Sequence, residues 1–412
     1  MMYAPLRSPL VPALLAVVLC ACGDDGGGEA SATATEGAST TAATTEATEG
    51  TSDSDSDTGT DSDSGGGAMG CDGASLLPLP DDVAAPGPWP VGAKTVTVAE
   101  RTTEIWYPAV PGSEAGVEAA RYDLRLHLPA AEQGKIPDEA NPFQDCDCYR
   151  DLPLDDAHGP YPAVLFIHGT AGFRSQSLTF MTHWASRGFV VVSSDHDGIT
   201  LADVLGGNLN ADQAGDAGKV LDALQAPAGE LAFLEGHIDA GRIGMAGHSA
   251  GGSAISGFGG RAQVLMPMAA GGATPGGALK STLILGAIED AIVPYSSQQG
   301  GYAGAAPMKR LVGLSDAGHL AFSDLCVLGA DQGGILQIAL DYGVEVPEFL
   351  IPLAQDGCGD GFLDPEIGYT ITNAATAAAL QETLHCDARG TAALAGLVAQ
   401  YPEIGEYLEA LE

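Results

Sequence analysis

The sequence predicts an α/β protein whose sheet is doubly wound and mostly parallel. Six short apolar runs lack the alternation of a half-exposed strand, a pattern that is typical of strands buried on both faces. Helical candidates lie between these runs, and an alternation of strands with helices favours parallel pairing through right-handed crossovers. We therefore expect one large sheet that is covered by helices on both faces.

The predicted strands fall into two groups. Residues 94–98 and 103–107 are rich in β-forming side chains and lie close enough in the sequence to form an N-terminal antiparallel pair. The parallel strands are expected at 163–167, 189–193, 243–246, 264–268, 282–285 and 310–314.

Three helices are expected among these strands. Residues 178–186 form the first, which ends before Gly188. Residues 212–235 form a longer one, rich in Ala and Leu although Pro227 interrupts it, and a third begins at Ala250. The end of the chain is expected to be a helical C-terminal tail.

The charge of the chain excludes one large class of partners. Its 412 residues include 54 acidic side chains against 16 Lys and Arg, for a formal net charge of −38. Binding to a phosphate backbone depends on Lys and Arg, so nucleic acid is excluded as the default partner. Since such a chain is also repelled by anionic membrane surfaces, we expect membrane contact only through a covalent anchor.

Residues 1–21 have the pattern of a lipoprotein signal peptide. The apolar run 10–19 is too short to span a bilayer as a helix. Residues 19–22 resemble the bacterial lipobox, in which a cysteine that follows a small residue is lipidated and becomes the new N-terminus. The resemblance implies a lipid anchor on Cys22 and a location in the bacterial cell envelope. Cys20 is the rival anchor, and a plain secretory signal is the alternative.

A linker and one catalytic domain follow the signal peptide. Residues 22–70 consist almost entirely of Gly, Ala, Ser, Thr, Asp and Glu, so this segment has too few apolar side chains to build a core. We expect it to be a disordered acidic tether. The catalytic domain is then expected over residues 71–412.

The six cysteines of this domain indicate disulfides. An even number in an exported chain is typical of a disulfide framework, but the sequence leaves all 15 pairings open. The spacing of Cys146 and Cys148 lacks the gap that zinc sites prefer, so no metal site is expected. The acidic loop 356–366, which contains Cys358, is interpreted as a loop held by a disulfide. The six are Cys71, Cys146, Cys148, Cys326, Cys358 and Cys386.

The strongest functional motif is Gly-His-Ser-Ala-Gly at residues 247–251. It follows the predicted strand 243–246 and precedes a helix rich in small residues. Glycines two positions before and two after a serine allow the sharp strand-to-helix turn that exposes a nucleophilic hydroxyl. The helix N-terminus then faces the oxyanion that develops during attack. The motif therefore predicts that Ser249 is a nucleophile.

With this motif the chain resembles the α/β-hydrolase fold. More narrowly, it is similar to the branch that contains dienelactone-hydrolase-like proteins, platelet-activating-factor acetylhydrolases, chlorophyllases and cutinase-like polyester hydrolases. The family keeps its triad in the chain order Ser, acid, His. The residues that carry the resemblance are 160–170, 187–192, 247–252 and 317–319.

The resemblance implies the remaining catalytic residues. Residues 286–294 match the family's Gly-x-x-x-Asp-x-x-Val-Pro loop, which makes Asp290 the acid and leaves Glu289 as the runner-up. His319 lies on the loop where the family keeps its base. The oxyanion hole would be formed by the backbone N–H groups of Thr170 and Ala250.

These residues predict a serine hydrolase that cleaves small-molecule or lipid-like carboxylic esters through an acyl-enzyme, without a cofactor. Aromatic side chains make up only 6% of the chain, and Thr170 stands where the polyester hydrolases carry an aromatic, so we expect a preference for short-chain, soluble esters. The segment 326–386 could instead fold over the cleft as a lid. A peptidase or amidase on the same triad, or a non-catalytic surface-binding lipoprotein, are the alternatives.

Overall fold

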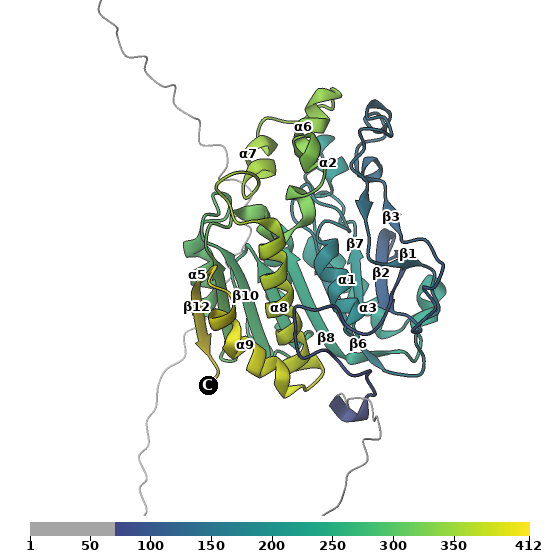
Figure 1. The fold of residues 1–412 in the computed structure, drawn as a ribbon, viewed down its shortest axis with the longest axis vertical. Coiled ribbons are helices and arrows are strands. Elements are labelled where there is room, and N and C mark those ends of the chain that lie inside the picture. Colours follow the sequence, from purple (N-terminus) through teal and green to yellow (C-terminus); the bar gives the residue numbers. More distant parts are fainter. Residues whose placement is uncertain (1–70) are drawn as a thin grey trace, which may run out of the picture. The chain divides into compact units, whose positions relative to one another are not determined.

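The structure is a computed structural model that describes residues 71–412, and it is built on one sheet of ten strands (Figure 1). The strand order across the sheet is β12-β11-β10-β9-β8-β6-β7-β2-β1-β5. A separate two-stranded sheet consists of β3 (Arg121–Tyr122) and β4 (Gln144–Asp145). The strands of the large sheet are β1 (Val91–Val98), β2 (Arg101–Pro108), β5 (Tyr149–Arg150), β6 (Tyr161–Ile167), β7 (Val190–Ser194), β8 (Ile238–His248), β9 (Val264–Met268), β10 (Ser281–Ala287), β11 (Lys309–Leu314) and β12 (Ile404–Ala410).

The predicted strands are confirmed, and their pairing creates a switch point in the sheet. Six neighbouring strands, β7 to β11 in the sheet order, are parallel, and β1 and β2 form the expected antiparallel pair. After β6 the chain adds β7 on one side and then crosses back to place β8 on the other. Ligands of open α/β sheets bind at the carboxyl ends of strands at such a point.

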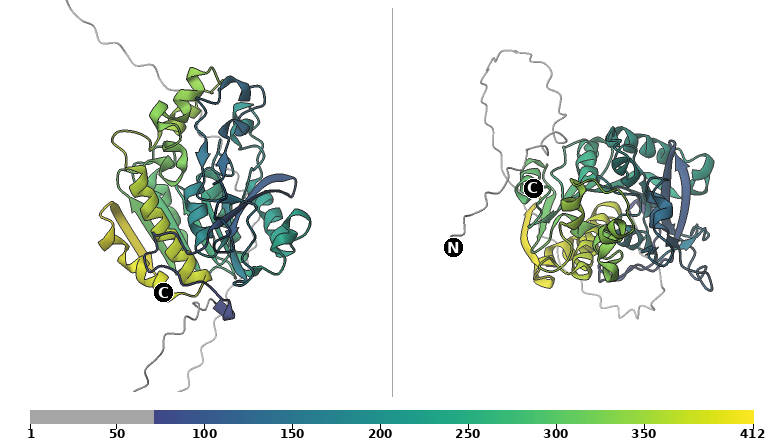
Figure 2. Two further views of the ribbon diagram at one scale, coloured as in Figure 1. Left: turned by 45° about the vertical axis from the view of Figure 1, so that its right-hand side comes forward. Right: turned by 90° about the horizontal axis from the view of Figure 1, so that it is seen from above.

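Helices cover both faces of the sheet. Buried side chains of α1, α8 and α9 pack with one set of alternating strand residues, while α3 packs with the opposite set. Figure 2 shows the C-terminal helices and β12 towards one end of the sheet and β1 and β2 towards the other. The helices are α1 (Leu178–Ser186), α2 (Leu201–Leu205), α3 (Gln213–Gln225), α4 (Ala250–Ala254), α5 (Tyr295–Gly304), α6 (Gly334–Asp341), α7 (Leu350–Gln355), α8 (Pro365–Leu384) and α9 (Ala388–Gln400).

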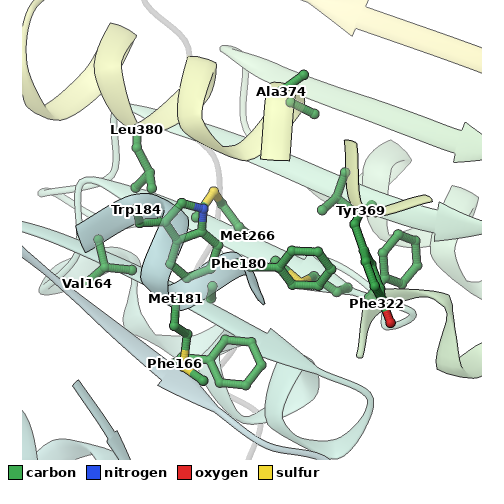
Figure 3. Packing of buried hydrophobic residues seen from close by; sticks show 14 of the residues in the cluster. Val164, Phe166, Phe180, Met181, Trp184, Met266, Phe322, Tyr369, Ala374 and Leu380 are labelled. Carbon is green, nitrogen blue, oxygen red and sulfur yellow. The ribbon is translucent and has the colours of Figure 1, made fainter. Parts of the chain in front are cut away.

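The long helix α8 is part of the core. It begins at Pro365, directly after Asp364, whose carboxylate accepts the backbone N–H of Glu366 as an N-cap. The Trp184 indole of α1 donates a hydrogen bond to Thr376 Oγ1 at 2.8 Å. Figure 3 shows Trp184 beside Leu380 of α8, above side chains that project from the sheet.

Two sequence-based expectations need correction. The predicted helix 212–235 is shorter: α3 ends at Gln225, because Pro227 cannot continue the helical hydrogen bonds, and a separate 3₁₀ turn occupies Gly229–Leu234. The C-terminal tail is not purely helical, because it ends in β12, which pairs antiparallel with β11. β12 extends the sheet beyond its last parallel strand.

Three disulfides resolve the pairing that the sequence left open. They join Cys71 to Cys386, Cys146 to Cys148, and Cys326 to Cys358. The third closes a segment that contains α6 and α7, and it holds the acidic loop at residue 358 as expected. The first joins the beginning of the described chain to the turn between α8 and α9.

The predicted signal peptide, Cys22 and the predicted linker lie outside the described residues. Within residues 71–412, no helix combines the length and the apolar character that a membrane crossing requires.

Candidate active site

Ser249 lies at the turn between β8 and α4. Its backbone has φ 56° and ψ −119°, a conformation that L-residues rarely adopt. The flanking glycines allow this turn: a Cβ on Gly247 would lie 2.5 Å from the backbone of Gly251, and one on Gly251 would lie 2.1 Å from the carbonyl oxygen of Ile167. The turn leaves Ser249 half-buried at the carboxyl end of β8, where it lines a pocket.

His319 and Asp290 approach Ser249 from the loops that follow β11 and β10. His319 Nε2 lies 2.8 Å from Ser249 Oγ, and His319 Nδ1 lies 2.9 Å from Asp290 Oδ2. His319 is fully buried, and Asp290 is 6% exposed. The structure thus brings the three predicted side chains into one hydrogen-bonded row. In such a row the imidazole can take the serine proton while the carboxylate fixes its tautomer and orientation.

The carboxylate of Asp290 is held by three further donors. Its Oδ1 accepts the backbone N–H groups of Ile292 at 2.9 Å and Val293 at 2.7 Å. Its Oδ2 also accepts Nε2 of the buried Gln298 at 3.1 Å. Together with the imidazole, these donors occupy the four acceptor positions of a carboxylate. Glu289, the alternative acid, has an exposed side chain, so the geometry favours Asp290.

Two buried residues, Gln176 and His248, connect three loops of the site. Gln176 Oε1 accepts the backbone N–H of Gly169 at 3.2 Å, and its Nε2 donates to His248 Nδ1 at 2.8 Å. His248 Nε2 then donates to the carbonyl oxygen of His319 at 2.8 Å. Burial, with a smaller effect of the neighbouring His319, lowers the pKa of His248 to about 3. His248 therefore serves as a neutral connector rather than as a base.

Of the two residues predicted to supply oxyanion donors, Thr170 lies on a loop near Ser249 and Ala250 follows Ser249 in the chain. A Cβ on Gly169 would lie only 3.1 Å from Ser249 Cβ, so the loop that carries Thr170 passes close to the nucleophile. Ala250 is the first residue of α4. Within residues 71–412, the backbone N–H of Thr170 and that of Ala250 donate no hydrogen bond. Neither N–H group is thus committed to an acceptor in this part of the chain, which is one condition that an oxyanion hole must meet.

Asp356 holds the acid loop and the base loop together. Its buried Oδ2 accepts the backbone N–H of Ala291 at 3.0 Å and that of His319 at 3.2 Å. Its carbonyl oxygen accepts the backbone N–H of Leu320 at 2.9 Å. Asp356 follows α7 and stands two residues before Cys358, so the segment closed by the Cys326–Cys358 disulfide is bonded directly to both loops.

A largely apolar pocket of about 140 Å³ opens beside Ser249. On the side of the nucleophile the pocket is lined by Thr170, His248, Ser249 and His319. Its other walls come from two segments, residues 124–142 and 325–354, with a contribution from α2. Figure 1 shows α2, α6 and α7 close together beyond one end of the sheet. Part of the segment 326–386 therefore does cover the site, while its remainder, α8, packs on the sheet.

Two comparisons with known proteins found a match. The chain matches the solved structure of a ferulic acid esterase from Streptomyces cinnamoneus with a TM-score of 0.52 and 21% sequence identity, over 74% of this chain and 93% of that one. The chain has the α/β-hydrolase fold. The profile of the family "Platelet-activating factor acetylhydrolase, isoform II" matches residues 141–202, a stretch that contains β6, Thr170 and α1. No curated protein sequence matches the chain significantly.

Three residues that support this site were not predicted from the sequence. Gln176 and Gln298 are neutral amides without a motif, and only their burial beside the reactive groups marks them. Asp356 did carry a signal, because it belongs to the acidic loop 356–366, but that loop was interpreted as a loop held by a disulfide and not as part of the site. Within residues 71–412, no group of three or more His, Cys, Asp or Glu side chains could hold a metal ion.

Proposed function

We propose that this α/β-hydrolase is a serine hydrolase that cleaves carboxylic esters through an acyl-enzyme on Ser249. The observation that carries the proposal is the row of hydrogen bonds from Ser249 Oγ through His319 to Asp290. The likeness to a ferulic acid esterase and the local match to an acetylhydrolase family agree with ester hydrolysis.

In the proposed reaction, His319 Nε2 takes the Ser249 proton as Oγ attacks the ester carbonyl. The tetrahedral oxyanion accepts the N–H groups of Thr170 and Ala250, and Asp290 stabilises the imidazolium. His319 then gives its proton to the leaving alcohol as the bond from carbon to the alcohol oxygen breaks. A water molecule, deprotonated by the same imidazole, attacks the acyl-enzyme, and the acid leaves as Ser249 regains its proton.

Labelling with a fluorophosphonate tests the nucleophile. We expect the probe to modify the parent protein on Ser249 and to leave Ser249→Ala unmodified. We also expect Ser249→Ala and His319→Ala each to lower the turnover of p-nitrophenyl acetate by at least about 10⁴-fold while the circular dichroism spectrum is retained. A Ser249→Ala protein that turns over at the parental rate would contradict the proposal, and a matched panel of amides tests the peptidase alternative.

We also propose that Cys22 carries a lipid anchor that places the enzyme in the bacterial cell envelope. This proposal rests on the sequence pattern of residues 19–22 alone. Mass spectrometry of the mature N-terminus checks it: we expect an acylated Cys22, together with extraction by detergent from the membrane fraction. An unacylated N-terminus at another residue would remove the anchor.

A further inference from the structure

The walls of the active-site pocket restrict which esters fit. Two segments that lie outside the large sheet supply most of the wall. The first contributes Leu124, Leu128 and Ile136, and the second contributes Leu336 of α6 and Leu353 of α7. Since these side chains are apolar, the pocket favours an apolar group over a polar one, in proportion to the area that the group removes from water.

The volume of the pocket sets the size of that group. The pocket encloses about 140 Å³. A dry protein cavity of roughly 150 Å³ holds one benzene molecule. The enclosed space therefore suits about six carbon atoms, and a slightly longer chain can extend towards the opening. An acetyl group would leave most of the apolar wall without a partner.

The charged side chain in the wall is already neutralised. Arg125 lines the pocket, but its guanidinium donates to Asp123 at 2.7 Å and pairs with Asp138 at 2.7 Å. It also donates to the carbonyl oxygen of Ile136 at 3.1 Å. An anionic substrate group would have to compete with two carboxylates for this cation, so the pocket favours an uncharged group.

We infer that the substrate is an ester with an uncharged apolar group of six to eight carbon atoms, which occupies this pocket. The inference rests on the proposed ester hydrolysis and changes the expected chain length, since the low aromatic content and Thr170 had suggested short-chain esters. The apolar group can belong to the acyl part or to the alcohol part of the ester. In both arrangements the pocket binds the group by burying its apolar surface.

Two series of esters test the inference on the full-length protein. The first varies the acyl chain from acetate to dodecanoate with p-nitrophenol as the constant alcohol, and the second varies linear alcohols from ethyl to dodecyl as acetates. In one of the two series we expect kcat/KM to rise about fourfold per methylene up to six carbons, the factor that corresponds to the burial of one CH₂. It should level off or fall beyond eight carbons. The series that rises identifies the part of the ester that enters the pocket.

A pair of substitutions on α6 links the profile to the pocket. Leu336→Trp fills space beside the pocket, whereas Leu340→Trp makes the same change at a position on the same helix that is 45% exposed and does not line the pocket. We expect Leu336→Trp to lower the ratio of the six-carbon to the two-carbon kcat/KM by at least about tenfold. Leu340→Trp should leave this ratio at the parental value.

The outcomes separate this inference from the proposed function. If Ser249 is labelled and acetate is cleaved, but kcat/KM is highest at two carbons or flat in both series, the inference is overturned and the proposed function stands. If Ser249 is neither labelled nor active on any ester, both are overturned. A parental ratio in Leu336→Trp would also overturn the assignment of the apolar group to this pocket.

Discussion

At the scale of single residues, the site depends on groups that hold a reactive side chain as much as on the reactive side chain itself. Ser249 is fixed by a strained backbone turn, and Asp290 is fixed by four hydrogen bonds. A carboxylate that orients an imidazole acts by accepting its N–H, and an amide in the same place can instead present a donor.

We therefore predict that Asp290→Asn lowers kcat for p-nitrophenyl acetate by about 10³- to 10⁴-fold with a much smaller change in KM. Glu289→Gln is the matched control, because it removes the neighbouring carboxylate from an exposed position. Steady-state kinetics of both variants check the prediction. A similar loss of kcat in both would show that the acid has been assigned to the wrong residue.

A second prediction concerns the buried Asp324, which belongs to the 3₁₀ turn Asp324–Cys326 and contacts the first turn of α1. Its Oδ2 accepts the backbone N–H of Thr179 at 3.1 Å and Nε2 of Gln144 at 2.9 Å, while its Oδ1 has no hydrogen-bond partner in the described chain. Burial raises the pKa of Asp324 to about 7, above its ordinary value of 3.8. Between these two pH values the folded state holds a proton that the unfolded state has lost, so stability falls as the pH rises from about 4 to about 7.

Asp324→Asn removes this titration. We expect the melting temperature of the variant to fall less than that of the parent between pH 5 and pH 8, with a difference in unfolding free energy of up to about 3 kcal/mol. Asp331→Asn, at an exposed position a short distance along the chain, is the control and should follow the parent. Differential scanning calorimetry at the two pH values is the measurement. Parallel pH profiles for all three proteins would contradict the prediction.

Some residues of the site could be recognised from a sequence motif, and others could not. Ser249 and His319 stand in short motifs, because a strand-to-helix turn and a Gly-His loop need particular residue types at fixed spacing. Gln176 and Asp356 have no such requirement. They act through side-chain contacts with residues that are distant in the sequence, and only the folded chain brings those partners together.

At the scale of elements, the segment closed by the Cys326–Cys358 disulfide contributes both to binding and to alignment. Its helices α6 and α7 form part of the pocket wall, and Asp356 at its end bonds to the loops of the acid and the base. A displacement of about 1 Å in a catalytic group can cost about 10²-fold in rate. Substrate binding and the position of His319 therefore depend on one segment.

We predict that Asp356→Ala lowers kcat for p-nitrophenyl acetate by about 10- to 100-fold and changes KM less. Asp356→Asn should restore most of the rate, because an amide oxygen can still accept the two N–H groups. Asp360→Asn, at an exposed position in the same loop, is the control. Steady-state kinetics decide the matter: if Asn and Ala at position 356 have the same kcat, the carboxylate does not position the two loops through these hydrogen bonds.

The elements themselves were predictable where burial on both faces produces a continuous apolar run. This is why the central strands from β6 to β11 matched the sequence. The edge strand β12 was missed, because the segment Ile404–Ala410 carries two glutamates and is buried less completely than the central strands. Such charges are common on edge strands, where they discourage pairing with other chains. For the pocket wall, the sequence offered the segment 326–386 as an alternative lid but gave no signal for residues 124–142, because the apolar side chains of these two segments meet only in the folded chain.

At the scale of the whole molecule, the Cys71–Cys386 disulfide bridges 315 positions of the chain, whereas Cys146–Cys148 bridges two. In the chain-entropy description, the stabilisation by a crosslink grows with the logarithm of the number of residues in the loop that it closes. By this relation the long crosslink stabilises the folded state by about 6 kcal/mol, and the short one stabilises it by about 2 kcal/mol or less.

We therefore predict that the double substitution Cys71→Ala and Cys386→Ala lowers the melting temperature more than Cys146→Ala with Cys148→Ala does. Thermal denaturation followed by circular dichroism compares the two proteins, and thiol counting on the denatured, unreduced parent first verifies that these cysteines are oxidised. Equal losses of melting temperature would show that the long crosslink does not stabilise the fold through the unfolded chain.

The same long crosslink gives the molecule the topology of a ring with two tails. The ring runs from Cys71 to Cys386, and the carboxyl-terminal tail, with α9 and β12, leaves it at nearly the same point at which the chain enters. A protease that makes one cut within the ring releases no piece, so separation of fragments after a single cut also requires a reductant. When the chain ahead of Cys71 is pulled against the C-terminal end, the shortest covalent path runs through one sulfur–sulfur bond to Cys386, and the strands β8, β10 and β11 lie outside that covalent path.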